Sequence, residues 1–269
     1  MKYGLIGEKL SHSLSPLIHR IFFDITGKKG QYELIELKHN ELESFLINAE
    51  QENYHGLNVT IPYKTVIMNY MENISDEARE IGAVNTIKLK GGLKGYNTDY
   101  YGIDYTFKKS GINPSGKKVL STGSGGAAKA VVAYLKNFAD KIYIASRDKN
   151  YARKKFPQVI VISYEEIVGH GPFDIVINTT PVGMYPLTED SPLNKEQLKG
   201  SGFLFDLIYN PEKTKLMRLA GEMGIPCVNG MYMLAAQAVK AQEIWQGENY
   251  GIDLVDAIYN RLKIGTDNF

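Results

Sequence analysis

Apolar and polar residues near the start of the chain alternate in patterns that predict strands and helices in turn. Lys2–Gly7 is a short apolar run ending in glycine, which is typical of a buried strand. Ser15 and Pro16 then open the stretch LIHRIFFDITG, which predicts a helix with Ser15 as N-cap and Pro16 at its first position. Gln31–Leu37 has the pattern of a second strand. The chain therefore begins in the strand–helix–strand order of an α/β protein.

The next stretch adds a helix, a strand, a second helix and a hairpin. A helix is predicted to begin at Asn40, and the β-branched run within Leu57–Ile61 predicts a strand. We expect Pro62 to end that strand, because proline has no N–H for a sheet ladder. Asp76–Ile81 predicts a short helix, and VNTIKLKGGLKGYN predicts two strands that turn at the pair Gly91-Gly92.

The pattern becomes more regular after Asn97. A helix is predicted over 100–110, followed by a linker that contains proline and glycine over 111–118. Five apolar runs then alternate with helical stretches such as 127–138; the runs are Lys118–Ser121, Lys141–Ala145, Val159–Ile162, Asp174–Asn178 and Phe203–Leu207. Strands that alternate with helices predict a parallel, doubly wound sheet. Two further helices, Met231–Trp245 and Leu254–Leu262, follow the last strand.

Composition narrows the class of protein. The chain has 269 residues, 43% of them hydrophobic, and a formal net charge of +1, so it lacks the basic excess that a nucleic-acid binder usually carries. Its single cysteine, Cys227, excludes an internal disulfide and favours a reducing compartment. The start MKYGLIGEKLSHS turns polar too soon for a signal peptide, and no apolar run approaches a membrane span. We expect a soluble cytoplasmic protein.

A glycine-rich turn stands between a predicted strand and a predicted helix. Gly123, Gly125 and Gly126 lie in STGSGGAAKAVVAYL, directly after Lys118–Ser121. Small residues there let a pyrophosphate approach the backbone N–H groups at a helix N-terminus, where the helix dipole favours anions. The alternative is a tight turn that needs glycine only for packing. Because the turn opens a strand–helix–strand series, the sequence favours phosphate binding.

The end of the next strand indicates which dinucleotide binds. An NAD site usually has Asp or Glu about 20 residues beyond the glycine turn, to hold the ribose 2′-hydroxyl. Here KIYIASRDKN places Ser146 and Arg147 at that point. The planar donors of arginine suit a 2′-phosphate, so we predict NADP. Asp148 could repel that phosphate or accept a 2′-hydroxyl, which leaves NAD open.

Three polar groups in the first part of the chain are candidates for a substrate site. Ser13 and Ser15, just before a helix, suit a carboxylate. NVTIPYK, residues 58–64, carries an amide, a hydroxyl and a lysine near a strand end, and Asn97-Thr98-Asp99 follows the hairpin. Oxidising a secondary alcohol removes a hydride from carbon and a proton from oxygen. A lysine can exchange that proton while a carboxylate orients it, which makes Lys64 and Asp99 a candidate pair.

Eight stretches in order then resemble one family over nearly the whole chain: SHSLSP, NVTIPYK, IGAVNTI, GYNTDYYG, GSGGAAKA, NTTPVGM, DLIYNPEKT and the late MLAAQA. The sequence resembles the shikimate dehydrogenases. The resemblance implies reduction of 3-dehydroshikimate to shikimate with NADPH, without a metal, on the route to chorismate and aromatic amino acids. It also implies a shikimate-binding domain over 1–101, completed by C-terminal helices over 236–269, and a Rossmann-like NADP-binding domain over 102–235. The active-site cleft would lie between them.

The resemblance also assigns residues. Lys64 and Asp99 would be the acid/base pair at the reacting oxygen. The substrate-binding residues would be Ser13, Ser15 and Tyr209 at the carboxylate and Asn58, Thr60, Asn85, Asp99 and Gln237 at the hydroxyls. The cofactor-binding residues would be Gly123, Ser124, Gly125, Gly126, Ala127, Ser146, Arg147, Thr179, Thr180, Val182, Leu207, Gly230 and Met233.

The sequence departs from the family pattern at the predicted 2′-phosphate site. The pattern there is often Asn-Arg-Thr, with another basic residue a few positions on; this chain has Ser146-Arg147-Asp148, with Tyr151 at the later position. The basic residues of the segment 153–155 are candidates to replace the missing one. Three alternatives stay open: an NAD-dependent quinate/shikimate dehydrogenase, a non-catalytic sensor of shikimate or nucleotide, and a folate-linked dehydrogenase. The family contains monomers and homodimers, and the sequence does not separate them.

Overall fold

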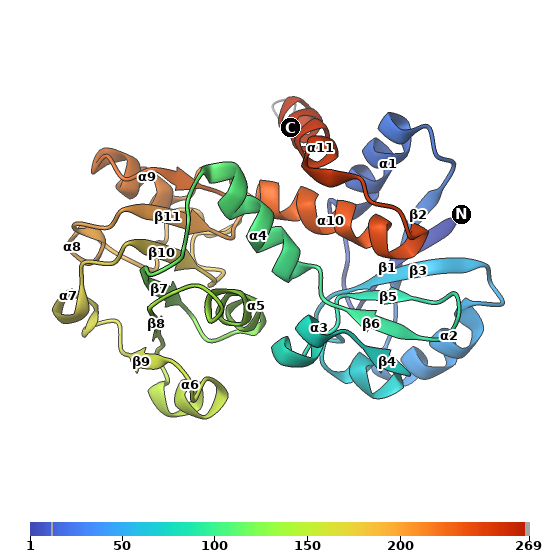
Figure 1. The fold of residues 1–269 in the computed structure, drawn as a ribbon, viewed down its shortest axis with the longest axis horizontal. Helices are drawn as coiled ribbons and strands as arrows, with labels where there is room; N and C mark the ends of the chain where they lie inside the picture. The colour runs from blue at the N-terminus through green and yellow to red at the C-terminus, as the bar shows by residue number, and fades with distance from the viewer. Residues whose placement is uncertain (12, 267–269) are drawn as a thin grey trace. The chain divides into compact units, whose positions relative to one another are not determined.

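The computed structural model of the protein describes residues 1–11 and 13–266 (Figure 1). It has two compact units, Met1–Gly102 with Leu234–Phe269, and Ile103–Met233. The chain enters the second unit within α4 (Asp99–Ser110) and re-enters the first within α10 (Met231–Gln246). The first unit is therefore built from two segments that are distant in the sequence.

A six-stranded mixed sheet forms the first unit, in the order β2-β1-β3-β5-β6-β4. β1 pairs in parallel with β2 and β3, and β5 pairs antiparallel with β3 and β6. The predicted hairpin is confirmed: Gly91 and Gly92 lie between β5 and β6 with φ of 83° and 94°, a region that favours glycine. The strands are β1 (Lys2–Gly7), β2 (Gln31–Glu36), β3 (Tyr54–Val59), β4 (Asn73–Ile74), β5 (Thr86–Lys88) and β6 (Lys94–Tyr96).

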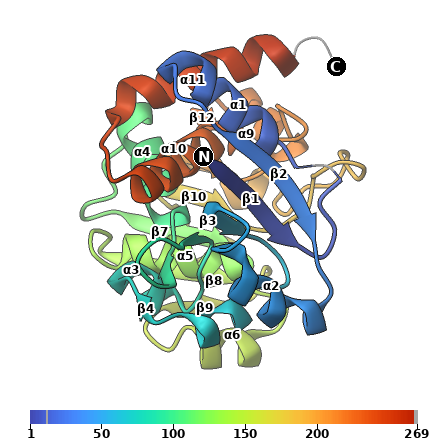
Figure 2. The ribbon, with the colours of Figure 1, turned by 90° about the vertical axis from the view of Figure 1, so that its right-hand side faces the viewer.

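Helices pack on both faces of this sheet. They are α1 (Ser15–Thr26), α2 (Leu42–Ala49), α3 (Asp76–Ile81), α10 and α11 (Gly251–Thr266), with short 3₁₀ helices η1 (His39–Glu41) and η2 (Val66–Tyr70). Figure 2 shows α1 and α11 on one side of β1 and β2 and α2 on the other. Successive side chains of β1 point to opposite faces of the sheet, so this strand contacts helices on both faces. Ile6 is buried in one core with Leu42 and Leu46 of α2, and Tyr3 stacks on Trp245 of α10 with ring centroids 4.7 Å apart.

Two local predictions in the first unit are wrong. Ser15 is the first residue of α1 and not its N-cap; Leu14 holds that position without a side-chain hydrogen bond, while the Ser15 N–H donates to Ser13 Oγ. The strand predicted over Leu57–Ile61 is β3, which begins at Tyr54 and ends at Val59. Thr60 lies past its end, although the Thr60 N–H still donates to the Ile6 carbonyl oxygen of β1.

The second unit contains a fully parallel six-stranded sheet in the order β12-β11-β10-β7-β8-β9. This is the doubly wound order, in which the direction of strand addition reverses between β7 and β10. The predicted α/β fold with a Rossmann-like second part is confirmed. The strands are β7 (Lys118–Thr122), β8 (Lys141–Ala145), β9 (Ile160–Ile162), β10 (Ile175–Asn178), β11 (Phe203–Asp206) and β12 (Cys227–Val228). β12 was not predicted, because its two residues are too few for a periodic signal.

Five helices connect these strands: α5 (Gly126–Leu135), α6 (Lys149–Lys155), α7 (Ile167–His170), α8 (Lys195–Leu198) and α9 (Lys215–Glu222). The core on one side of the sheet joins Leu120 and Leu204 of the strands to Leu198 and Leu216 of the helices, all of them fully or almost fully buried. Within the described part of the chain, no helix is both long and apolar enough to cross a membrane.

Candidate active site

Lys64 and Asp99 meet at the carboxyl end of β3. Lys64 Nζ donates to Asp99 Oδ2 over 2.8 Å, and the two side chains are 31% and 14% exposed. Asn85 Nδ2 donates to the other carboxylate oxygen, Oδ1, over 3.0 Å. The ammonium is thus fixed by a partly buried carboxylate that is itself fixed by an amide, while Lys64 keeps access to solvent. This is the arrangement that the exchange of one proton with a bound ligand needs.

Backbone contacts hold both partners in place. The loop after β3 is anchored by Tyr63, which is 1% exposed and donates its hydroxyl proton to the Leu37 carbonyl oxygen over 2.5 Å. The Lys64 carbonyl oxygen accepts from the Val84 N–H over 2.7 Å. Asp99 is the first residue of α4, and its N–H donates to Asn97 Oδ1 over 3.0 Å. The loop that carries Lys64 and the helix start that carries Asp99 are therefore each fixed by hydrogen bonds to residues that lie just before or just after strands of the first sheet.

A buried hydrogen-bond network extends from Asn85 across the sheet. Asn85 Oδ1 accepts from the Thr98 N–H over 2.7 Å and from Thr86 Oγ1 over 3.0 Å. Thr86 Oγ1 in turn accepts from Asn58 Nδ2 over 3.0 Å. Asn85 is 4% exposed, and Thr86 and Thr98 are fully buried. Such a satisfied network restricts each amide to one orientation.

The side chain of Asn58 makes four hydrogen bonds. Its Nδ2 donates to Thr86 Oγ1 and, over 3.2 Å, to the Asn85 carbonyl oxygen. Its Oδ1 accepts the Tyr32 hydroxyl over 2.7 Å, and its side chain also hydrogen-bonds His19. These four interactions use the whole hydrogen-bonding capacity of an amide. A ligand hydroxyl at Asn58 would therefore replace one of them.

His19 is a buried member of this group. It is 1% exposed and stacks on Tyr32 with ring centroids 4.0 Å apart. Its Nδ1 lies 2.9 Å from Gln242 Nε2, and Gln242 Oε1 already accepts from Gln246 over 2.6 Å. Gln242 therefore donates to Nδ1, and Nε2 is the protonated nitrogen of His19. Burial lowers the pKa of His19 to about 3, with the hydrogen bond to Asn58 opposing the shift.

We expect this histidine to make the stability of the first unit depend on pH. An unfolded histidine titrates near 6.5, so between pH 6.5 and about 3 the unfolded chain binds the additional proton. The free energy of unfolding then falls as the pH decreases through that range, by up to ~1.4 kcal/mol per pH unit. Urea unfolding at several pH values should give a shallower slope for His19→Gln than for the unmodified chain. Equal slopes for His19→Gln and the unmodified chain would contradict the assignment.

The two predicted carboxylate-binding serines lie next to this network. Ser13 Oγ donates to Ser15 Oγ over 3.1 Å, and Ser15 also hydrogen-bonds the Tyr32 hydroxyl. Tyr32 therefore connects Ser15 to Asn58. Thr60 and Gln237 are half-buried, after β3 and on α10 respectively. Tyr209 belongs to the second unit.

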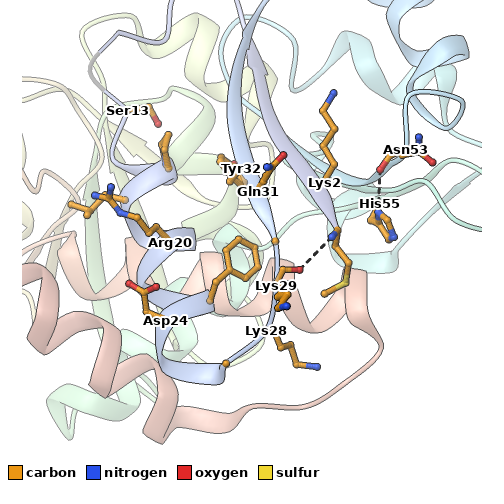
Figure 3. Close-up of a pocket in the computed structure, with 16 residues that line it drawn as sticks. Lys2, Ser13, Arg20, Asp24, Lys28, Lys29, Gln31, Tyr32, Asn53 and His55 are labelled. Carbon is orange, nitrogen blue, oxygen red and sulfur yellow. Dashed lines mark hydrogen bonds between the residues drawn. The ribbon is translucent and has the colours of Figure 1, made fainter.

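A large groove on the first unit does not contain the Lys64–Asp99 pair. It has a volume of about 1210 Å³ and is lined by α1, the turn after it and the first residues of β1 and β2. Figure 3 shows Arg20 and Asp24 on α1 across from Tyr32 and Gln31 on β2. Only Ser13 among the predicted site residues lines it. The Lys64–Asp99 pair, and not this groove, marks the candidate site.

A second cavity, of about 660 Å³, lies at the carboxyl ends of β7, β8 and β10 in the second unit. This is the point where the strand order reverses and where such sheets bind ligands. Among the thirteen predicted cofactor residues, those that line the cavity are Gly123, Ser124, Gly125, Ser146, Arg147, Thr179, Thr180 and Val182. The structure thus gathers residues from three separate loops into one cavity.

The glycine turn has the open space that a phosphate needs. Gly123 has a φ of 88°, and a Cβ there would come within 2.7 Å of Thr180, so this glycine is required by the turn itself. A Cβ on Gly125 or Gly126 would meet nothing within 4 Å. Gly125 caps α5 without any side-chain hydrogen bond, which leaves the first N–H groups of the helix available. Packing therefore explains the first glycine but not the other two.

The remaining predicted cofactor residues do not line this cavity. Gly126 and Ala127 form the exposed first turn of α5. Leu207 and Gly230 are in close backbone contact, because a Cβ on Gly230 would lie 2.0 Å from the Leu207 carbonyl oxygen. Met233 is buried on α10. No group of three His, Cys, Asp or Glu side chains suited to a metal ion occurs among the residues that the structure describes.

Comparisons with known proteins identify the family of this chain. Residues 5–87 match the family model described as shikimate dehydrogenase substrate binding domain. The NADP(+) shikimate dehydrogenase of Clostridium beijerinckii is 42% identical over 261 residues, which cover 96% of each chain. The chain belongs to the shikimate dehydrogenase family.

Solved structures from the shikimate dehydrogenase family have the same fold. A chorismate mutase/shikimate 5-dehydrogenase fusion protein from Clostridium acetobutylicum is similar with a TM-score of 0.95 and 41% identity, over 98% of this chain and 97% of that one. Shikimate 5-dehydrogenase from Thermus thermophilus, in complex with NADP(H) and shikimate, is similar with a TM-score of 0.86 and 28% identity, over 97% of this chain and 99% of that one.

The structure also explains the segment Ser146-Arg147-Asp148, where this member of the shikimate dehydrogenase family departs from the family pattern. Asp148 is the N-cap of α6, and its Oδ1 accepts from the Tyr151 N–H over 2.9 Å. Ser146 Oγ donates to the Asp148 carbonyl oxygen over 3.0 Å. Arg147 is exposed and lines the cavity. The acidic residue that kept NAD open is therefore engaged in starting a helix.

Several residues at or near these sites were not predicted from the sequence of this shikimate dehydrogenase family member. His19, Tyr32 and Gln242 gave no signal, because each lies in an ordinary strand or helix pattern. Tyr164 lines the cavity two residues after β9, and the rule that ligands bind at strand carboxyl ends could have found it. Asp206, fully buried at the end of β11, accepts from Asn178, Thr214 and the Ile208 N–H and so connects the end of β10 to the loop after β11. Burial raises the pKa of its carboxyl group.

Proposed function

We propose that this chain catalyses the reversible reduction of 3-dehydroshikimate to shikimate with NADPH as the reductant. The observation that carries the proposal is the 2.8 Å contact between Lys64 Nζ and Asp99 Oδ2, within a unit that matches the family's substrate-binding model. A protein that only senses a ligand has no need of an acid/base pair held by a third side chain. The two partners and the family assignment support the same reaction.

Side chains at two ends of the substrate would hold it. We assign Ser13, Ser15 and Tyr209 to its carboxylate. The ring hydroxyls would contact Asn58, Thr60, Asn85, Asp99 and Gln237. The network from Asn85 to Asn58 supports this assignment, because it fixes the amides before substrate binds and so lowers the ordering cost.

Lys64 would move the proton of the reaction. When bound, NADPH supplies the hydride that reduces the C3 carbonyl carbon. The Lys64 ammonium donates a proton to the oxygen of that carbonyl as negative charge develops there, which gives the C3 hydroxyl. Asp99 keeps the ammonium oriented toward this oxygen, and Asn85 keeps the carboxylate in place. In the reverse direction the neutral Lys64 amine accepts the hydroxyl proton.

The nucleotide would bind to the second unit. We assign the pyrophosphate to the turn over 123–127 and the 2′-phosphate to Ser146 and Arg147. Thr179, Thr180 and Val182 would contact the adenosine and nicotinamide path, and Leu207, Gly230 and Met233 would flank the nicotinamide. The open space at Gly125 and the cavity beside Arg147 support this assignment. The single cysteine suits a reaction in the reducing cytoplasm.

An assay with two acids and two cofactors tests the proposed function. We expect the protein to form NADPH from NADP⁺ with shikimate, and kcat/KM to be at least ~10-fold higher than with NAD⁺, since one charge-assisted contact contributes ~1.5–3 kcal/mol. Quinate should react more slowly than shikimate. Faster turnover of quinate with NAD⁺ would support the alternative dehydrogenase. Absence of any shikimate-dependent reduction of either cofactor would support the sensor.

A further inference from the structure

The basic end of α6 contains one lysine that contacts the glycine turn. Arg153, Lys154 and Lys155 are consecutive at the end of this helix, and the first two are exposed. Lys155 instead is half-buried, and its Nζ donates to the Ser124 carbonyl oxygen over 2.7 Å. Ser124 lines the nucleotide cavity. One of the three cations is therefore placed beside the cavity by a contact across 31 residues of sequence.

The ammonium of Lys155 lies close to Tyr151, which stands where the family pattern has a basic residue. The two residues are four apart on one helix and so share a face. Lys155 Nζ lies 3.4 Å from the Tyr151 hydroxyl oxygen and 5.2 Å from the centre of its ring. A lysine has a long, flexible side chain, which allows an ammonium to act one helical turn away from its own backbone position.

The polar groups around Ser124 suit a phosphate. Ser124 Oγ lies 3.3 Å from Ser146 Oγ, and both residues line the cavity with Arg147. The nearby Asp148 carboxylate already accepts the N–H that begins α6. A phosphomonoester carries up to two negative charges near neutral pH, more than one guanidinium neutralises. The Lys155 ammonium has three N–H donors, and Ser124 accepts from one of them.

We propose that Lys155 is a second cation for the 2′-phosphate of NADP and, with Arg147, sets the preference for NADP over NAD. This inference rests on the proposed function. Lys155 lies on α6 one turn after Tyr151, and its ammonium takes the place of the basic residue that this chain lacks at position 151. Arg153 and Lys154 have no such contact with a cavity residue among the interactions of the described chain.

Binding of two nucleotides by the full chain tests this role without an activity assay. Titration calorimetry would compare adenosine 2′,5′-bisphosphate with adenosine 5′-monophosphate, which lacks the 2′-phosphate. We expect Lys155→Met to weaken bisphosphate binding ~10-fold and to leave monophosphate binding within ~2-fold, as for the loss of one charge-assisted hydrogen bond. Lys154→Met is the matched control and should change neither. Lys155→Arg should keep most of the difference, and Arg147→Ala should reduce it.

Two results would overturn the inference. Equal weakening of both nucleotides would show that Lys155 only holds the glycine turn, and unchanged bisphosphate binding would show that it takes no part. Neither result bears on catalysis. Failure of the proposed function would appear separately, as an unmodified protein without shikimate-dependent reduction of NADP⁺.

Discussion

Replacing Lys64 with alanine should lower kcat by at least ~10²-fold while KM for shikimate changes little. General acid–base catalysis typically contributes 10²–10⁴-fold, and a group that acts in the transition state affects kcat more than ground-state binding. Asp99 and Asn85 would remain in place, because each has hydrogen-bond partners other than Lys64. Steady-state kinetics in both directions would measure the effect.

The matched control is Lys90→Ala, which removes an exposed lysine from the β5–β6 turn. It should leave kcat and KM unchanged. Circular dichroism of both variants separates a catalytic loss from an unfolded protein. A Lys64→Ala enzyme with near-normal kcat would exclude Lys64 as the acid/base.

Replacing Trp245 with alanine should destabilise the first unit by ~3–5 kcal/mol, the usual cost of removing a large buried aromatic side chain. Trp245 is 6% exposed, and its Nε1 donates to the Ile87 carbonyl oxygen of β5 over 2.9 Å. The ring also lies against Gly56 so closely that a Cβ there would be 2.1 Å from it. Through this side chain, α10 contacts strands β1, β3 and β5 of the sheet in the unit that contains Lys64 and Asp99.

Urea unfolding followed by circular dichroism would measure this change, because the variant lacks the only tryptophan. Trp245→Phe is the control: it keeps most of the ring and loses the hydrogen bond, for a cost of about 1–3 kcal/mol from the unpaired carbonyl. A loss below ~1 kcal/mol for Trp245→Ala would show that the C-terminal helices contribute little to the first unit.

Much of the fold followed from local patterns. β1 and β7 were predicted because each is a short apolar run that ends in glycine or precedes a glycine turn. Asp76–Ile81 was predicted with its correct bounds, and the structure shows that Ser75 caps this helix and Gly82 ends it. Ser15 shows the limit of this approach. A serine before proline is a good N-cap by propensity, but the contact of Ser15 with Ser13 and Tyr32 decides its position.

The residues of the candidate sites also divide into those that local patterns predicted and those that they did not. Residues of a distinctive type at a strand end or in a glycine turn, such as Lys64 and Gly123, could be recognised from the sequence. His19 and Tyr32 could not, because a histidine in an amphipathic helix and a tyrosine in a strand are ordinary core residues. Their role depends on a third element, α10, whose sequence lies more than 200 residues further on.

The sequence by itself determined the order of strands and helices, the glycine turn and the chemical types at the two sites, because these depend on short-range periodicity and on side-chain chemistry. Only the tertiary structure decided that Lys64 meets Asp99, 35 residues later, and that Lys155 contacts the glycine turn from one turn beyond Tyr151. Both contacts depend on strand pairing and on how loops and helices pack against the sheets. Local patterns do not encode these long-range distances. The sequence therefore indicated which chemical groups belong to the sites, but not which of them are in contact.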